Sequence, residues 1–355
     1  MSKFNIPWEL IFIWFFGNNV FFSCHSQEVL ERQVYYDNSQ KVYLKQTRTI
    51  PIQIDNGPTL GIITRIWVSD NSIYFLDYTA QSVYEYDLAG KFVNEIKNKT
   101  ITNQLKPSEI ISDEQGNLYI YDAITGNIQK FDKEGNYVGN FKKERDKYTA
   151  KLLSDFHKNF FHLCEKQGIS VLERIDIETG NAIFITQLSD KSLVKYVSFL
   201  GKLNGLSFSK KHNRVYHTFP WEYKIREIDA NSGKIISRFG LRPQTYTEYN
   251  LSLSNIKEII NLKPYWTTVV DQFVIDERFL FIQFFKQETQ KIDWYVYDLD
   301  TEKPVRGYSL GDNTLNNMNR RFVTKNNEIF VYSSPRSDQG DKSNGVVYAY
   351  SVLIE

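Results

Sequence analysis

The residues in this 355-residue chain best suited to metal chemistry are two histidines. His162 and His217 occupy equivalent positions in successive copies of a four-strand repeat. Paired imidazole nitrogens are typical Zn²⁺ ligands. These positions fall in the second strand of each repeat, however, where a side chain lies between packed sheets. We therefore expect both to be packed or hydrogen-bonded core histidines.

A second candidate set offers oxygen ligands. Glu109, Asn204 and Asp271 fall near the ends of first strands, and carboxylate and amide oxygens are the ligands that Ca²⁺ prefers. No sequence motif links the three residues. The sequence therefore predicts no metal ligands and no cofactor.

No recognisable catalytic motif accompanies these residues. The chain has no G-x-S-x-G nucleophile turn, no H-E-x-x-H helix and no phosphate-binding loop. Cys164 ends an apolar strand, which is typical of a buried, unreactive thiol. Asp77 and Asp122 end second strands and are expected to cap the adjoining turns. We predict no catalytic residues, which favours a protein that is not an enzyme.

The elements that must position these residues are clearest between Ser108 and Phe141. Four runs rich in Ile, Tyr, Phe and Val are separated by turns that contain Gly116 and Gly135. Such runs bounded by Gly, Asn and Asp are typical of short strands in a meander. The run 118–121 is apolar on both faces, which indicates a strand covered on both sides. An aromatic content of 15% also favours a β-rich core.

The same pattern recurs along the chain. Its third strands end in aspartate at Asp87, Asp132, Asp176, Asp229 and Asp298. A sixth copy, 328–350, lacks its fourth strand, and the strand-like run 41–52 precedes the first copy. We expect this run to complete the last blade. The prediction is an all-β fold, a six-bladed β-propeller of four-stranded antiparallel blades whose ring is closed by an N-terminal strand.

The repeat also resembles a known family. The pattern Gly116–Asp122, Asn127–Asp132 and Gly135 resembles an NHL repeat. The chain resembles the six-bladed NHL- or TolB-like propeller lipoproteins of Bacteroidetes over residues 40 to 355, most sharply over 64–141. This resemblance implies the fold and the compartment rather than an activity, since one fold hosts many functions.

The N-terminus has the proportions of an export signal. Lys3 precedes an apolar run at 10–16 that is too short to span a bilayer. Ser23-Cys24 resembles the end of a lipobox, where the cysteine would carry lipid; cleavage before Gln27 is the alternative. We therefore divide the chain into a signal peptide of lipoprotein type (1–24), a linker (25–40) and the propeller (41–355). The expected location is the cell envelope, in the periplasm or at the outer membrane.

The net charge and the loop lengths indicate which class of partner the chain binds and where. The net charge of +1, with no basic cluster, excludes nucleic acid as the default ligand. We expect a monomer that contacts the membrane only through a lipid at Cys24. In a meander, the loops between strands two and three share one rim with the links between blades, and in this chain they are the long ones. Long loops gathered on a rigid scaffold usually carry binding sites.

Aromatic residues on this long-loop rim are the candidate ligand contacts. Tyr and Trp can stack on a sugar or anchor a peptide, although they can equally cover the ends of the blades as a small core. The predicted function is an exported, non-enzymatic propeller that binds a protein or glycan partner. The alternative is a Ca²⁺- or Zn²⁺-dependent hydrolase or lyase with its site in the central channel. The candidate contacts are Trp221, Tyr223, Tyr246, Tyr249, Tyr265 and Trp266.

Overall fold

The computed structural model describes most of the chain from Leu30 onward. The described residues are 30–31, 37–53, 57–97, 105–143, 148–155, 158–166, 169–189, 205–240, 242, 246–247, 258, 261, 267–286, 291–307, 320–325, 327–334 and 344–354. Cys24 and the segment predicted as a signal peptide lie outside these residues. No helix in the described part is long and apolar enough to cross a membrane.

The first three blades follow one another along the chain. Blade A holds β3 (Ile63–Val68), β4 (Ser72–Asp77), β5 (Ser82–Asp87) and β6 (Phe92–Ile96). Blade B holds β7 (Pro107–Ser112), β8 (Leu118–Asp122), β9 (Asn127–Phe131) and β10 (Tyr137–Lys143). Blade C holds β11 (Tyr148–Ser154), β12 (Asn159–Lys166), β13 (Ile169–Asp176) and β14 (Ala182–Gln187).

The other three blades complete the ring. Blade D holds β15 (Gly205–Ser209), β16 (Arg214–Thr218), β17 (Ile225–Asp229) and β18 (Ile235–Phe239). Blade E holds β19 (Thr267–Ile275), β20 (Phe279–Lys286), β21 (Lys291–Asp298) and β22 (Lys303–Gly307). Blade F holds β23 (Arg320–Lys325), β24 (Glu328–Ser333), β25 (Val346–Ile354) and, as its outermost strand, β2 (Asp37–Pro51). The predicted six-bladed, all-β propeller is confirmed.

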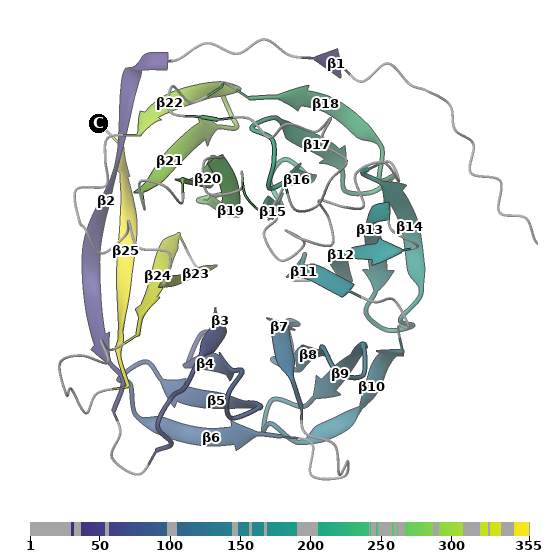
Figure 1. Cartoon of the computed structure of the whole chain (residues 1–355), viewed down its shortest axis with the longest axis vertical. Helices are drawn as coiled ribbons and strands as arrows, with labels where there is room; N and C mark the ends of the chain where they lie inside the picture. The colour runs from purple at the N-terminus through teal and green to yellow at the C-terminus, as the bar shows by residue number, and fades with distance from the viewer. Residues whose placement is uncertain are drawn as a thin grey trace, which may run out of the picture.

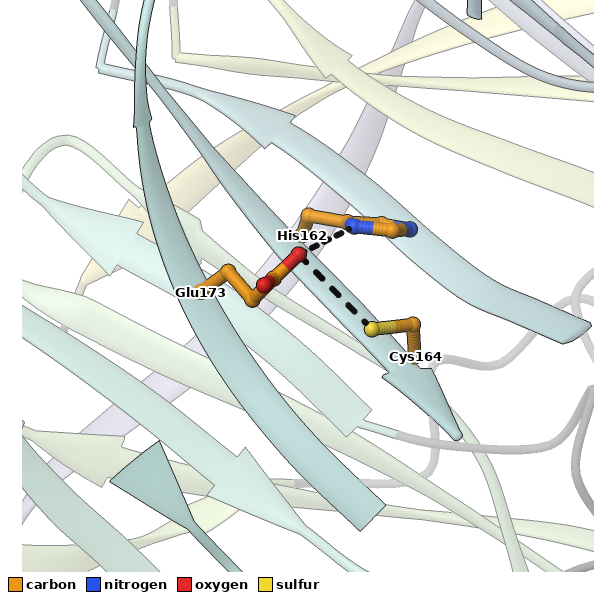
Figure 2. A group of neighbouring side chains, drawn as sticks. All are labelled: His162, Cys164 and Glu173. Atoms are coloured by element: carbon orange, nitrogen blue, oxygen red, sulfur yellow. Dashed lines mark hydrogen bonds and ion pairs between the residues drawn. The ribbon is translucent and has the colours of Figure 1, made fainter. Parts of the chain in front are cut away.

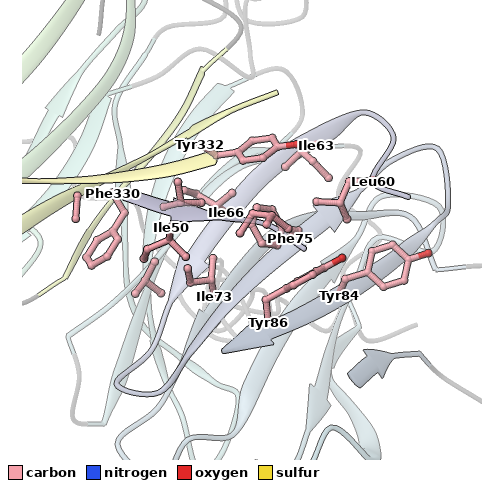
Figure 3. Packing of buried hydrophobic residues seen from close by; sticks show 14 residues of the cluster. Ile50, Leu60, Ile63, Ile66, Ile73, Phe75, Tyr84, Tyr86, Phe330 and Tyr332 are labelled. Carbon is pink, nitrogen blue, oxygen red and sulfur yellow. The ribbon is translucent and has the colours of Figure 1, made fainter. Parts of the chain in front are cut away.

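Six first strands surround the centre of the ring, and the later strands of each blade lie progressively farther out (Figure 1). The hydrophobic cores lie between neighbouring blades. Between blades F and A, for example, Phe75 makes edge-to-face contacts with Tyr332 at 5.1 Å and with Tyr86 at 5.3 Å between ring centroids (Figure 3). Such aromatic pairs contribute about 0.5–1.5 kcal/mol beyond the area they bury.

Aspartates at the strand ends hold the turns, as the sequence predicts. Asp77 accepts hydrogen bonds from the backbone N–H groups of Thr79 and Ala80 at 2.8 and 2.9 Å. Asp132 does the same for Glu134 and Asn136 at 3.1 and 2.7 Å. Each carboxylate thereby pairs turn amides that would otherwise lack a partner.

The N-terminal strand closes the ring. β2 pairs antiparallel with β25 from Val42 opposite Ile354 to Pro51 opposite Val346, and its first residues pair in parallel with β22 of blade E. It begins at Asp37, inside the segment expected to be a linker. Upstream of it, β1 (Leu30–Glu31) pairs in parallel with β18 of blade D. β1 and β2 therefore lie along the outer edges of blades D, E and F.

The end of β2 also fits closely against blade A. Gly90 lies in the turn between β5 and β6 with φ +80°, and a Cβ there would come within 2.0 Å of the Pro51 carbonyl oxygen. Only glycine accommodates both the left-handed backbone and this approach. The N-terminal strand is thus anchored on both blades that meet at the closure.

Removing this strand tests the closure. Deleting residues 41–52 would expose the edge of β25 and remove the buried side chains of Val42 and Ile50. We expect a large drop in melting temperature, or failure to fold, because large core deletions cost several kcal/mol. Calorimetry of the truncated and full-length chains measures it. Equal melting temperatures would contradict this closure.

Candidate functional site

Four charged side chains come from equivalent positions on four first strands. They are Arg65 on β3, Glu109 on β7, Lys151 on β11 and Asp271 on β19. Each immediately follows a shift in strand register, where one extra residue interrupts the pairing with the second strand. Such bulges re-aim a side chain. We call these four residues the charged ring.

Ion pairs link the charged ring across the centre of the propeller. Arg65 Nη2 lies 2.6 Å from Glu109 Oε1 on the neighbouring blade, and Arg65 Nη1 lies 3.4 Å from Asp271 Oδ2 of blade E. Lys151 Nζ pairs with the other oxygen of Asp271. The side chains are 9–21% exposed. Blades A and C are therefore both tied to blade E, and blade A also to blade B.

Burial and charge act in opposite directions on these groups. Burial alone would raise the pKa of Asp271, but the charges of Lys151 and Arg65 and hydrogen bonds from Lys151 and the Gln272 backbone outweigh it, so the pKa is lowered. Burial would likewise lower the pKa of Arg65, whereas Glu109 and Asp271 raise it above the ordinary value. The ring therefore holds two cations and two anions that compensate one another.

Blade D contributes no charge at the equivalent position, which is Gly205. A Cβ at Gly205 would lie 2.5 Å from Oε1 of Gln272. That amide is buried and accepts from the Thr218 hydroxyl at 2.7 Å while donating to Ser207 Oγ at 2.9 Å. Blades D and E therefore meet closely here, joined by a neutral hydrogen-bond network instead of an ion pair.

A cavity of about 410 Å³ extends from the charged ring along the channel. Its walls are partly apolar, with side chains that include Trp67, Leu153, Phe208 and Phe273. It reaches the rim of short turns at Lys210, Asp276, Glu277, Lys325 and Asn327. Among the described residues, none on the long-loop side of the charged ring lines it. The ring therefore forms one end of a pocket that faces the short-turn rim.

The mouth of this cavity includes a turn in an unusual conformation. Asp276 and Glu277 both have a backbone φ of +52°, a left-handed conformation that residues other than glycine rarely adopt. Glu277 accepts from Ser209 Oγ at 2.8 Å and from the Lys211 backbone N–H at 3.1 Å. Asn327 donates to Asp276 at 2.9 Å. These contacts to blades D and F offset the conformational cost and fix the mouth.

The aromatic residues predicted as ligand contacts have a different setting. Trp221 is 4% exposed and stacks on Phe219 at 4.6 Å between centroids, with 11° between the ring planes. Tyr246 is also 4% exposed and contacts half-buried Tyr223 at 5.3 Å. Trp221 and Tyr246 thus pack in the cores between blades. Tyr249, Tyr265 and Trp266 lie outside the described residues, so a role of these rings in binding stays a prediction.

The three residues predicted as candidate oxygen ligands have different settings. Glu109 and Asp271 do meet in the channel, whereas Asn204 lies outside the described residues. Sequence reasoning missed Arg65 and Lys151, their cationic partners. Aligning the first strands of the repeats would have placed both cations at the position that Glu109 occupies in its own copy.

The two histidines are buried, as expected. His162 Nδ1 lies 3.1 Å from Glu173 Oε2, and Cys164 Sγ lies 3.9 Å from the same oxygen (Figure 2). His217 is fully buried, makes an edge-to-face contact with Phe219 at 4.5 Å, and neither ring nitrogen has a hydrogen-bond partner. Both are therefore core histidines with different environments.

Comparison with known proteins shows which solved structures share the fold of this chain. No family model and no curated protein matches it. A putative exported protein from Bacteroides fragilis superposes with a TM-score of 0.60 at 12% identity, covering 91% of this chain and all of the other. A DUF4221 family member from Bacteroides vulgatus gives 0.60 at 10% identity over 88% and 98%. A catalytically inactive virginiamycin B lyase from Staphylococcus aureus gives 0.52 at 11% identity over 88% and 100%. These likenesses show the fold alone.

The environment of His217 predicts a pH dependence of stability. Burial, and then the charge of Arg226, lower its pKa well below 6.5. The unfolded chain therefore binds a proton near pH 6.5 that the folded chain does not, and the stability conferred by neutral His217 is lost as the pH falls below 6.5. We expect the free energy of unfolding to fall by up to about 1.4 kcal/mol per pH unit from this group.

Replacing the imidazole isolates that contribution. The variant His217→Phe keeps an aromatic ring against Phe219 but cannot titrate. Its free energy of unfolding, measured by denaturant titration at pH 7.5 and pH 5, should change less with pH than that of the unaltered chain. An identical pH dependence in both proteins would show that His217 is protonated as easily in the folded chain as in the unfolded chain, which would contradict the prediction.

Proposed function

We propose that this chain is an exported, non-enzymatic β-propeller that binds a partner in the cell envelope, and that the central cavity receives part of that partner. The cavity between the charged ring and the short-turn rim carries the proposal. Its volume of about 410 Å³ falls within the range of small-ligand pockets. It combines apolar walls with a few fixed charges, as such pockets do. It accommodates a few side chains or a chain terminus rather than a whole domain.

The chemistry of the cavity favours a protein partner over a glycan. A charged side chain or chain terminus can form ion pairs with Arg65, Glu109, Lys151 or Asp271, whereas a neutral sugar offers these groups hydrogen bonds alone. Trp221, one of the rings predicted to stack on a sugar, is buried and therefore offers no stacking surface. The long-loop rim remains a second place where the partner can make contact.

Ion pairing also favours binding over metal-dependent catalysis in the channel. Glu109 and Asp271 would be the oxygen ligands of a cation there. Each is already paired with Arg65 or Lys151, so a metal ion bound there would lie beside cationic groups that repel it. The alternative of a hydrolase or lyase in the channel therefore has less support.

The proposed setting is the cell envelope. The likeness to a putative exported protein supports export, as does the apolar N-terminal run. We further propose that the chain is an NHL- or TolB-like propeller lipoprotein, a monomer held at the membrane by lipid on Cys24. A fixed end near a membrane would keep the propeller among other envelope proteins.

Filling the cavity tests the proposal. Thr324 is half-buried and lines the cavity, so Thr324→Trp should occupy it. Val138→Trp, on the exposed outer strand β10, is the matched control. Calorimetric titration with short charged peptides should show binding to the unaltered chain and Val138→Trp, and at least about tenfold weaker binding to Thr324→Trp.

Neutral oligosaccharides, titrated in parallel, discriminate between the two classes of partner. Binding of oligosaccharides but not of peptides would overturn the choice of a protein partner. Equal peptide affinity in all three proteins would overturn the placement of the site in the channel.

A further inference from the structure

Three side chains with metal-binding atoms meet between blades B and C. His162 and Cys164 project from the same face of β12, and Glu173 lies directly opposite His162 on β13. Phe160 and Ile175, which share this face, belong to a core cluster with Tyr119 of blade B. The imidazole and the thiol both point toward the Glu173 carboxylate (Figure 2). The three ligand atoms lie within 4.8 Å of one another.

These separations are close to those of a tetrahedral metal site. Ligand atoms about 2.0–2.3 Å from a zinc ion lie about 3.3–3.7 Å apart. The His162 nitrogen and the Cys164 sulfur lie 3.1 and 3.9 Å from the same oxygen of Glu173. Shifts of less than about 1 Å would seat an ion, and the fourth position remains for water or for the second carboxylate oxygen.

The neighbouring blade provides an internal comparison. In blade D, the positions equivalent to His162, Cys164 and Glu173 hold His217, Phe219 and Arg226. That set repeats the histidine but has no thiol, and a cation replaces the carboxylate. The histidine position is thus shared by blades C and D, and of these two blades only blade C assembles the ligand set.

Charge balance at these side chains favours a divalent cation. Glu173 is 1% exposed, and Lys166, 29% exposed, lies with Nζ 2.6 Å from its second oxygen. A divalent ion bound to the Cys164 thiolate and the Glu173 carboxylate would leave the site neutral without the lysine, whose ammonium group can turn toward solvent. The metal–sulfur bond forms as the thiol releases its proton to solvent.

We propose that His162, Cys164 and Glu173 bind a single Zn²⁺ ion between blades B and C. Imidazole, thiolate and carboxylate in one buried set favour zinc among the common divalent ions. The site lies away from the channel and joins two adjacent strands of blade C. Its role is therefore to stabilise the propeller, independently of the proposed partner.

Cobalt substitution tests this site directly. The purified full chain, freed of metal with a chelator, is titrated with Co²⁺ alone. We expect one ion per chain, with a thiolate-to-cobalt charge-transfer band and the visible bands of a tetrahedral ion. Cys164→Ser and His162→Gln should each weaken binding by at least about 100-fold, beyond what removing an outer-sphere partner costs.

His217→Gln is the matched control, since it alters the equivalent histidine of a blade without the ligand set. It should retain the charge-transfer band, and circular dichroism establishes that each variant folds. Absence of the band in the unaltered chain would overturn the proposal. So would a band that persists in Cys164→Ser and His162→Gln, because the ion would then be bound elsewhere.

Discussion

The ion pairs of Asp271 with Lys151 and Arg65 are the interaction on which the centre of this propeller depends. Blades contact their neighbours through apolar cores, whereas blade E has one blade between itself and each of blades A and C, so a direct connection between them has to cross the channel. The charged ring supplies that connection, linking blade E to blades A and C. Because the groups are partly buried, removing one charge would leave its partner partly desolvated and without the opposite charge that compensates it.

The same constraint shapes the cavity. The charged ring forms one end of the described pocket, which faces the short-turn rim. The rim in turn is held by contacts between blades, as at Glu277 with Ser209. A rigid mouth and a compensated charged end suit a site that recognises a ligand without changing shape, because little conformational freedom is lost on binding.

Much of the fold follows from local sequence. Turn aspartates such as Asp132 and turn glycines such as Gly135 act within one hairpin, so each blade could be predicted from its own residues. The closing strand could be predicted because the last copy lacks a strand. The charged ring could not, because its members come from distant repeats and meet only once the ring closes and a bulge re-aims each side chain. Trp221 illustrates a related limit, since the sequence leaves both ligand contact and core packing open for an aromatic residue in a loop until its stacking partner is known.

The coupling energy between Lys151 and Asp271 tests the central claim most directly. A double-mutant cycle with Lys151→Met, Asp271→Asn and the combined variant, followed by chemical unfolding, isolates the pair from the effects of each substitution. We predict a favourable coupling of at least about 1 kcal/mol, above the few tenths typical of exposed ion pairs. Additive effects, with a coupling of about zero, would contradict a channel held together by charge.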